Sequence, residues 1–190
     1  MSAWASIVIA SRWIDWASGI AGWLGSEQAV SSKSASEGAI PSGNAMAAQA
    51  FLRGGLLLGD DRLYQLGLGV LRAYHELLMK SPASAPSLML ATQFHLGAPK
   101  EVVIAGDPGD ERTHRLLQVA WNTFPQPCVV TCIHDGNREA LVALSPVFRG
   151  KVPVDGAPAA YVCERGACLA PVTDPDALSA ALRPRGADKK

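Results

Sequence analysis

The sequence lacks a surplus of charge and is poor in cysteine. Its 17 lysines and arginines balance 17 aspartates and glutamates, so the basic stripe of a nucleic-acid-binding protein is missing. Four cysteines in a chain of 190 residues are too few for a disulfide scaffold. With 48% hydrophobic residues the chain can bury one sizeable core. We therefore expect a globular protein without a nucleic-acid partner.

No apolar run is long enough for a membrane span, which needs about 20 consecutive apolar residues. The first 24 residues are apolar and rich in tryptophan, but Arg12 and Asp15 interrupt them. No basic segment precedes them, so they do not match a secretory signal. Their apolar side chains repeat at helical spacing, and we expect this face to pack on other protein segments; a membrane-surface helix is the alternative. We predict a cytoplasmic location.

Motifs of known catalytic and binding sites are also missing. Gly-x-Ser-x-Gly, His-Glu-x-x-His and Cys-x-x-Cys do not occur, so a hydrolase nucleophile, a zinc protease site and a thioredoxin-type site have no support. The loop 106–110 follows a predicted strand, where α/β proteins bind phosphates, but it lacks the lysine of a phosphate loop. We interpret it as an ordinary turn, with nucleotide binding as the alternative. The sequence predicts no catalytic residue, metal or cofactor.

The hydrophobic pattern divides the chain into four parts. Residues 1–36 form an atypical Trp-rich segment and a Ser/Gly-rich linker, and residues 183–190 form a disordered tail. Residues 37–98 have helical periodicity, which predicts helical hairpins. Residues 99–182 predict a small α/β appendage. The expected fold is mostly α with a small α/β part.

Residues 37–98 predict three helices. The first runs from a cap at Ser42 or Asn44 to about Leu58, where Gly59 ends it. The second continues from Asp60 to about residue 80 as one helix, and the third covers residues 87–96. The second has one apolar stripe at helical spacing, formed by Leu63, Leu66, Val70, Tyr74 and Leu77. Short links between the helices favour antiparallel neighbours.

Residues 99–182 have the pattern of strands. Three apolar runs predict buried strands, at residues 101–105, 128–133 and 159–163. A helix from Asp110 to about Phe124 joins the first two into a βαβ unit. Its predicted inner face consists of Leu116, Leu117, Ala120 and Trp121. A weak helix is expected at 138–144, and Pro175 after Thr173 or Asp174 predicts the start of the last helix.

The four cysteines form two pairs along the chain. Cys128 and Cys132 lie on one predicted strand, which separates them by about 13 Å at about 3.3 Å per residue. Two ligands of one zinc cannot be that far apart. A turn at 164–167 can bring Cys163 and Cys168 within bridging distance. We interpret the cysteines as buried or free thiols, with a disulfide or redox pair and a metal site as alternatives.

Small and polar residues gather at the start of the first predicted helix. They are Glu37, Pro41, Ser42, Gly43 and Asn44. One interpretation is a helix entry, since the first turn leaves backbone N–H donors free. The alternative is a cavity in which Ser42 and Asn44 bind a small polar or sugar ligand. Glycosidases need two carboxylates, and Glu37 is the single candidate acid near these side chains.

Five segments occur in the order found in one protein family: 38–44, 86–91, 101–108, 160–168 and 171–175. Together they resemble the C-terminal third of the spermatogenesis-associated, thioredoxin-domain-containing family, over residues 37–182. The resemblance implies an N-terminal thioredoxin-like domain in full-length members. It also implies an (α/α) toroid similar to N-acylglucosamine 2-epimerases and six-hairpin glycosidases. This chain would then hold incomplete toroid helices followed by a βαβ-type unit.

Two departures from the family shape the functional expectation. The thioredoxin-like domain and the first part of the toroid are absent from this sequence, and the turn 164–167 lacks the asparagine expected within the family's Cys-x4-Cys. We expect a fragment without complete catalytic machinery. It would expose an apolar helical face through which it self-associates. A carbohydrate-active protein with a cavity around Ser42 and Asn44 is the alternative.

Overall fold

The computed structural model describes residues 37–38, 40–122, 127–164 and 166–183. The predicted Trp-rich segment, the linker and the tail after Arg183 lie outside the described residues. The chain divides into two compact units. Among the described residues, one is a helical unit of residues 37–54 together with 62–91, and the other is an α/β unit of residues 55–61 and 92–183.

Helices dominate the part of the chain between Gly43 and Leu96. They are α2 (Gly43–Leu58), α3 (Asp61–Ala73), α4 (His75–Lys80), the short 3-10 helix η2 (Pro82–Ser84) and α5 (Pro86–Leu96). The predicted cap is present, because the Ser42 hydroxyl accepts a hydrogen bond from Ala45 N at 3.1 Å. Gly59 follows α2 with a φ of 63°, a conformation that favours glycine.

The prediction of one continuous helix from Asp60 to residue 80 is wrong. Tyr74 has φ −107° and ψ 16°, so α3 and α4 are separate helices. Main-chain hydrogen bonds nevertheless continue across this residue, from Tyr74 N to Val70 O and from Leu78 N to Tyr74 O. The helical spacing of the apolar side chains therefore continues past Tyr74, although the backbone conformation changes there. For this reason the hydrophobic pattern of the sequence does not reveal the break between α3 and α4.

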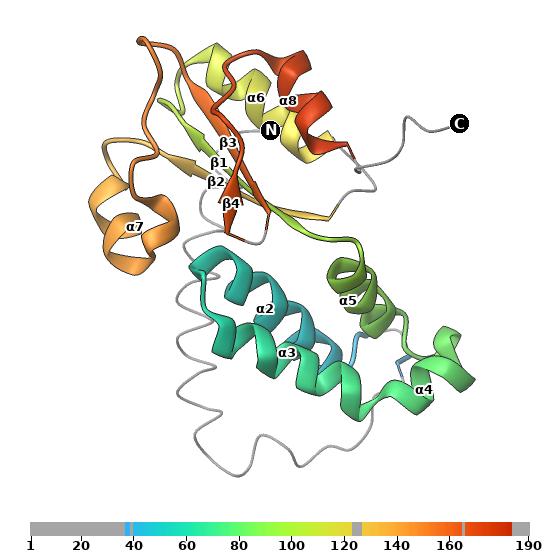
Figure 1. Ribbon diagram of the computed structural model, residues 1–190. Helices are drawn as coiled ribbons and strands as arrows, with labels where there is room; N and C mark the ends of the chain where they lie inside the picture. The colour runs from blue at the N-terminus through green and yellow to red at the C-terminus, as the bar shows by residue number, and fades with distance from the viewer. Residues whose placement is uncertain (1–36, 39, 123–126, 165, 184–190) are drawn as a thin grey trace. The chain divides into compact units, whose positions relative to one another are not determined.

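Helix α3 packs on α2 through a close backbone approach (Figure 1). Gly67 of α3 lies against Leu52 of α2, and a Cβ added to this glycine would stand 2.7 Å from Leu52 Cγ. Leu52, Ala48 and Ala45 are completely buried and recur at helical spacing along α2. The inner stripe of α2 thus provides the core of the helical unit.

The α/β unit contains a four-stranded mixed sheet in the order β2-β1-β3-β4. The elements are β1 (Lys100–Ala105), α6 (Glu111–Asn122), β2 (Cys128–Ile133), α7 (Arg138–Leu144), η3 (Pro146–Phe148), β3 (Ala159–Glu164), β4 (Ala167–Cys168) and α8 (Pro175–Leu182). Strands β1 and β2 pair in parallel from Lys100↔Cys128 onward, which confirms the predicted βαβ unit. Strand β3 pairs with β1 in antiparallel direction.

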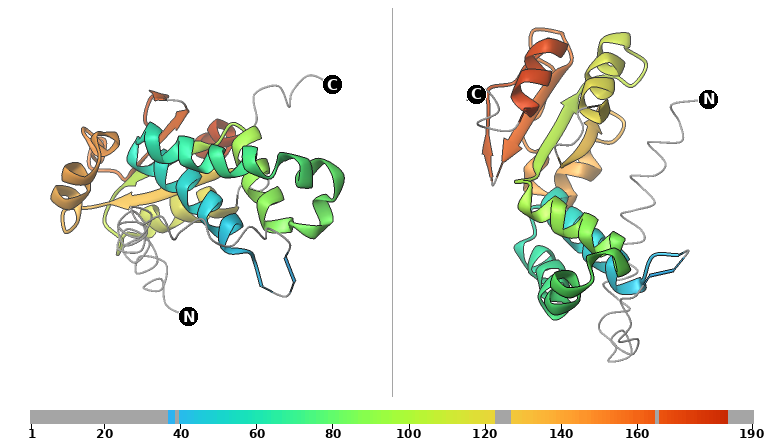
Figure 2. Two further views of the ribbon diagram at one scale, coloured as in Figure 1. Left: turned by 90° about the horizontal axis from the view of Figure 1, so that it is seen from below. Right: turned by 90° about the vertical axis from the view of Figure 1, so that its right-hand side faces the viewer.

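Helices cover both faces of this sheet. Helices α6 and α8 lie side by side on one face, where Leu116 and Leu178 pack with Val102 (Figures 1 and 2). The other face packs against α7 and η3, through Leu141 and Phe148. Alternate residues of β1 therefore enter two different cores.

The prediction that Trp121 faces inward is wrong, since its side chain is 55% exposed. The buried stripe of α6 is formed by Thr113, Leu116, Leu117 and Ala120, at the spacing i, i+3, i+4 and i+7. Trp121 lies about 100° around the helix from Ala120, beyond the edge of this buried stripe.

The two ends of α8 are held by side chains. Asp174 accepts a hydrogen bond from Ala177 N at 2.9 Å, and Pro175 follows it, as the start signal predicts. At the other end, the buried Lys100 donates to the carbonyl oxygen of Ala181 at 2.8 Å. None of the helices that the structure describes has the length and apolarity needed to cross a membrane.

Candidate functional site

Glu37 lies at the N-termini of two helices of the helical unit. One carboxylate oxygen accepts from Ser42 N at 3.3 Å, directly before α2. The other oxygen accepts from Ser87 N at 2.8 Å, in the first turn of α5. A carboxylate is favourable at both places, because the first N–H groups of a helix have no partner within the helix and carry partial positive charge. The Glu37 side chain thereby links the starts of α2 and α5.

The other predicted cavity residues surround this contact. The Ser42 hydroxyl donates a hydrogen bond to the Glu37 carboxylate at 3.5 Å, and it also caps α2. Asn44 lies two residues further along the chain, and its amide donates to the Tyr74 hydroxyl at 2.9 Å. Pro41 and Gly43 are exposed and contribute no side-chain polar group. The structure therefore brings Glu37 and Ser42 together, while Asn44 bonds to the start of α4.

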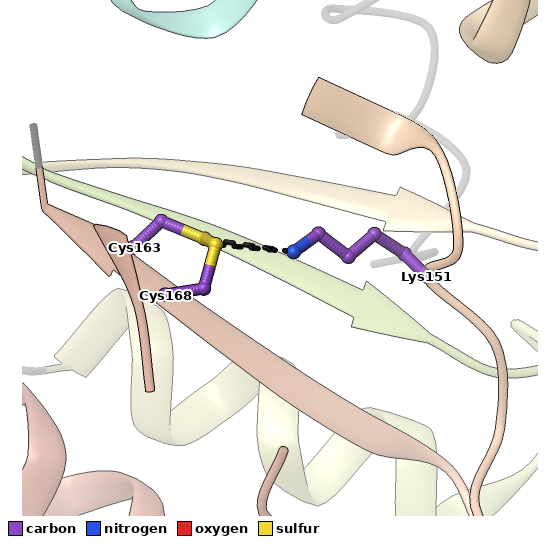
Figure 3. The surroundings of a disulfide bond; sticks show 3 residues. All are labelled: Lys151, Cys163 and Cys168. Atoms are coloured by element: carbon purple, nitrogen blue, oxygen red, sulfur yellow. Dashed lines mark hydrogen bonds between the residues drawn. A yellow bond between two sulfur atoms is a disulfide. The ribbon is translucent and has the colours of Figure 1, made fainter. Parts of the chain in front are cut away.

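Cys163 and Cys168 are joined by a disulfide in the structure (Figure 3). They are register partners in the β3–β4 hairpin, with their Cα atoms 3.9 Å apart. The hairpin turns with Gly166 at a φ of 79°. Cys163 is 2% exposed, whereas Cys168 is exposed at the end of β4. The disulfide thus joins a buried residue to an exposed one.

Lys151 extends from the segment after η3 toward this disulfide (Figure 3). Its Nζ lies 3.2 Å from Cys168 Sγ and 3.6 Å from Cys163 Sγ. The same Nζ stands 4.7 Å from the centre of the Tyr161 ring, a cation–π distance. The Tyr161 hydroxyl donates to Val152 O at 2.8 Å, which fixes the segment that carries Lys151 over the ring.

The surroundings of the disulfide are buried and charged. Lys151 is 9% exposed and Glu101, the β1 register partner of Cys163, is 7% exposed. Burial lowers the pKa of Lys151, and the attraction of Glu101 opposes this shift. Burial likewise raises the pKa of Glu101, and Lys151 opposes it. We define the lysine–disulfide cluster as Glu101, Lys151, Tyr161, Cys163 and Cys168.

The remaining cysteines are separate from this cluster. Cys128 and Cys132 lie four residues apart on β2, and neither takes part in a disulfide. Burial, with a smaller contribution from Asp107, raises the pKa of Cys132 to about 11. Among the described residues, no group of three or more histidine, cysteine or acidic side chains could hold a metal ion.

The loop 106–110 uses its carboxylates to build the turn before α6. Asp107 accepts from Gly109 N at 2.6 Å, and Asp110 accepts from Arg112 N at 2.8 Å. Asp110 also pairs with the Arg112 guanidinium at 2.7 Å. Negative side chains therefore occupy the N–H donors that a bound phosphate would use.

Sequence reasoning identified both cysteines of the cluster but missed its other members. Tyr161 has a recoverable signal, because strand alternation places residues 161 and 163 on the same face. Lys151 lies in a non-periodic segment between η3 and β3, and no local pattern connects it with Cys168. Only the fold brings this lysine to the disulfide.

Comparison with known proteins gives a partial match. No protein-family model matches the chain, and no solved structure matches it. The chain is 28% identical to human spermatogenesis-associated protein 20 over 149 residues, and 28% identical to the rat protein over 153 residues. These regions cover 78% and 80% of this chain but 19% of each relative, so the chain spans about a fifth of their length. The predicted resemblance to the spermatogenesis-associated, thioredoxin-domain-containing family is thereby confirmed, as a similarity to one part of these proteins.

Proposed function

We propose that this chain serves as a non-catalytic part of the family's helical architecture, whose helices pack against further helical segments of the same kind. The observation that carries this proposal is the position of Glu37. Both of its carboxylate oxygens accept N–H groups at helix starts. This is the role of a structural cap, because hydrogen bonds from the main chain already occupy both carboxylate oxygens.

A sugar-converting site also needs a second acid or base near the first. Glycosidases place two carboxyl groups roughly 5–10 Å apart across the reacting bond. The other acidic residues of the helical segment 40–98 are exposed on α3 and α4 or directly before α3: Asp60, Asp61 and Glu76. Glu76 forms an exposed ion pair with Lys80 at 2.8 Å. These positions are typical of solvated helix surfaces.

Helix α5 supports a packing role because it is apolar on opposite faces. Its inner face buries Leu88, Ala91 and Phe94. Its outer face exposes Met89 at 39%, Leu90 at 55% and Leu96 at 74%. Exposed leucine and methionine side chains on one side of a helix are typical of a surface that packs against another protein segment. The occupant that we propose for this outer face is a further helix of the family architecture, because the relatives are about five times longer than the matched region.

We expect the chain by itself to associate through this outer face, because exposed apolar side chains favour such contacts. The test combines oligomeric state with turnover. Light scattering should show concentration-dependent association of the full chain, and the double variant Leu90→Gln/Leu96→Gln should reduce it. Met79→Gln, which replaces an equally exposed apolar residue on α4, is the matched control and should leave it unchanged.

The carbohydrate-active alternative makes a different prediction. Incubation with a panel of glycosides and N-acylated amino sugars would then give hydrolysis or epimerisation that Asn44→Ala abolishes. The non-catalytic role predicts that neither the wild type nor any of these variants converts the substrates. Turnover that is lost in Asn44→Ala would overturn the non-catalytic role, and a wild-type monomer at all concentrations would overturn the packing role.

A further inference from the structure

We propose that the Cys163–Cys168 disulfide is a reversible redox site, which exchanges electrons with a dithiol co-reactant, and that Lys151 is the cation that stabilises its reduced form. This site is independent of the packing role proposed above. It rests on three features of the α/β unit: the unequal exposure of the two cysteines, the position of the lysine ammonium, and the shortness of β4.

The two cysteines differ in their access to solvent. Cys168 lies in the exposed strand β4, whereas Cys163 is 2% exposed in β3. An attacking thiolate therefore reaches Cys168 first, and Cys163 becomes the leaving sulfur. Exchange rates increase with access to the attacked sulfur and with a low pKa of the leaving thiol. The buried position of Cys163 would raise its thiol pKa unless a cation were close to it.

Lys151 supplies that cation. Its Nζ stands 3.6 Å from Cys163 Sγ and 3.2 Å from Cys168 Sγ. In the oxidised state a buried ammonium faces neutral sulfurs and the Tyr161 ring, and no carboxylate forms an ion pair with it in the part of the chain that the structure describes. Burying a charge without a direct partner is unfavourable. Reduction creates that partner, because a thiolate then lies beside the ammonium.

Thiol–disulfide exchange with a dithiol reduces the cysteine pair in two steps. A thiolate of the co-reactant attacks Cys168 Sγ, the Sγ–Sγ bond breaks, and its electron pair leaves on Cys163 Sγ as a thiolate next to Lys151. The second thiol of the co-reactant loses its proton to water and attacks its own sulfur in the mixed disulfide. This step releases Cys168 as a thiolate and closes the co-reactant's disulfide. Two electrons pass to the cysteine pair, and the two protons of the co-reactant pass to water or to the new thiolates.

The hairpin can undergo this change without loss of the sheet. Strand β3 is held by β1 along its whole length, from Glu101↔Cys163 to Ala105↔Ala159. Strand β4 consists of Ala167 and Cys168 and pairs with β3 alone. Separation of the sulfurs therefore moves β4 while Cys163 and Lys151 keep their supports.

The test uses the full chain with Cys128→Ser and Cys132→Ser, so that only the pair can react. The protein is equilibrated in buffers of reduced and oxidised dithiothreitol at pH 7, and the oxidised fraction is measured from the mass added by a thiol-alkylating reagent. We expect reduction of the folded protein at millimolar dithiothreitol, with circular dichroism unchanged. In Lys151→Met the pKa of the thiol beside residue 151 should rise by about one unit, so the equilibrium constant for reduction, when the titration is repeated at a pH above both thiol pKa values, should fall about tenfold.

Arg149→Met is the matched control, since it removes an exposed positive charge two residues away and should leave the equilibrium unchanged. Lys151→Arg keeps the positive charge, so its equilibrium constant for reduction should be close to that of the wild type. A second measurement needs no variant at position 151: the pH dependence of alkylation of the reduced pair should give a thiol pKa below about 8.5. Reduction that occurs only after unfolding, a thiol pKa above about 8.5, or equal constants for Lys151→Met and Arg149→Met would overturn the proposal.

Discussion

Lys100 Nζ donates a hydrogen bond to the carbonyl oxygen of Ala181 at 2.8 Å, although 81 residues separate them in the sequence. The same nitrogen donates to Arg183 O at 3.0 Å. The last carbonyl groups of a helix have no partner within the helix, and a cation there is favourable. The first residue of β1 thus closes the end of α8, and it joins the central strand of the α/β unit to its final helix.

Replacement of this lysine should destabilise the α/β unit. Lys100→Met keeps the aliphatic stem but leaves two carbonyl groups without their charged donor, so we expect a loss of about 2–3 kcal/mol in the free energy of unfolding. Urea denaturation measures this loss. Lys80→Met is the control, because it removes a lysine from an exposed ion pair and should cost about 0.5 kcal/mol or less. Equal losses in the two variants would contradict the capping role.

Two glycines of α3 should respond to alanine with opposite signs. A Cβ at Gly67 would stand 2.7 Å from Leu52 Cγ, so Gly67→Ala should separate α3 from α2 and destabilise the protein by about 1–3 kcal/mol. A Cβ at Gly69 meets no atom within 4 Å. Gly69→Ala should therefore stabilise by about 0.5–1 kcal/mol through the better helix propensity of alanine. Thermal unfolding of both variants tests the contact between α2 and α3. If both alanine substitutions stabilised the protein, or both destabilised it, this contact would be contradicted.

The stability of the protein should depend on pH through Glu101. Burial raises the pKa of Glu101 above the ordinary value of 4.5, against the opposing attraction of Lys151. Between pH 4.5 and the raised value, the folded state binds more protons at this side chain than the unfolded state does. The contribution of Glu101 to stability must therefore increase as pH falls through this window.

Glu101→Gln should remove this dependence. The wild type should gain stability relative to the variant as pH falls. The difference in the free energy of unfolding, wild type minus variant, should therefore increase from neutral pH toward pH 4.5. Chemical denaturation at several pH values measures the difference. A constant difference across this window would mean that Glu101 has no raised pKa in the folded protein.

Cys132 should be an unreactive thiol in the folded state. Burial, and then the charge of Asp107, raises its pKa from 9.0 to about 11, so the thiolate fraction at pH 8 is about a hundredfold lower than in the unfolded chain. Alkylation with iodoacetamide, followed by peptide mass mapping, should modify this residue about a hundredfold more slowly in native buffer than in denaturant. Equal rates would show that β2 opens readily to solvent at this position.

Much of the secondary structure follows from patterns within single segments. The start of α8 is predictable because Asp174 and Pro175 combine a side-chain acceptor with the backbone angle of a first helical turn. The βαβ unit is predictable because continuous apolar runs at β1 and β2 flank an amphipathic helix. The break at Tyr74 is not predictable in this way, since hydrogen bonds on either side of it preserve the period of the stripe.

The lysine–disulfide cluster shows what local patterns omit. The spacing of Cys163 and Cys168 indicates that the two sulfurs can meet across a turn, which the β3–β4 hairpin provides. Lys151 reaches them from a coil segment held by the Tyr161 hydroxyl, and that placement depends on contacts between residues nine or more positions apart. At the start of α2, by contrast, the residues Glu37 and Ser42 were identifiable as neighbours because a helix entry brings them together within five positions.

The disulfide joins residues that are only five positions apart. In the chain-entropy description, a cross-link stabilises a protein by restricting the unfolded chain, and the effect increases with the number of residues in the closed loop. A loop of this size gives about 2 kcal/mol, against about 4.7 kcal/mol for a loop of 100 residues. Because the closed loop is so short, opening this sulfur–sulfur bond should cost the protein less stability than opening a long-range cross-link would, as the proposed redox role requires.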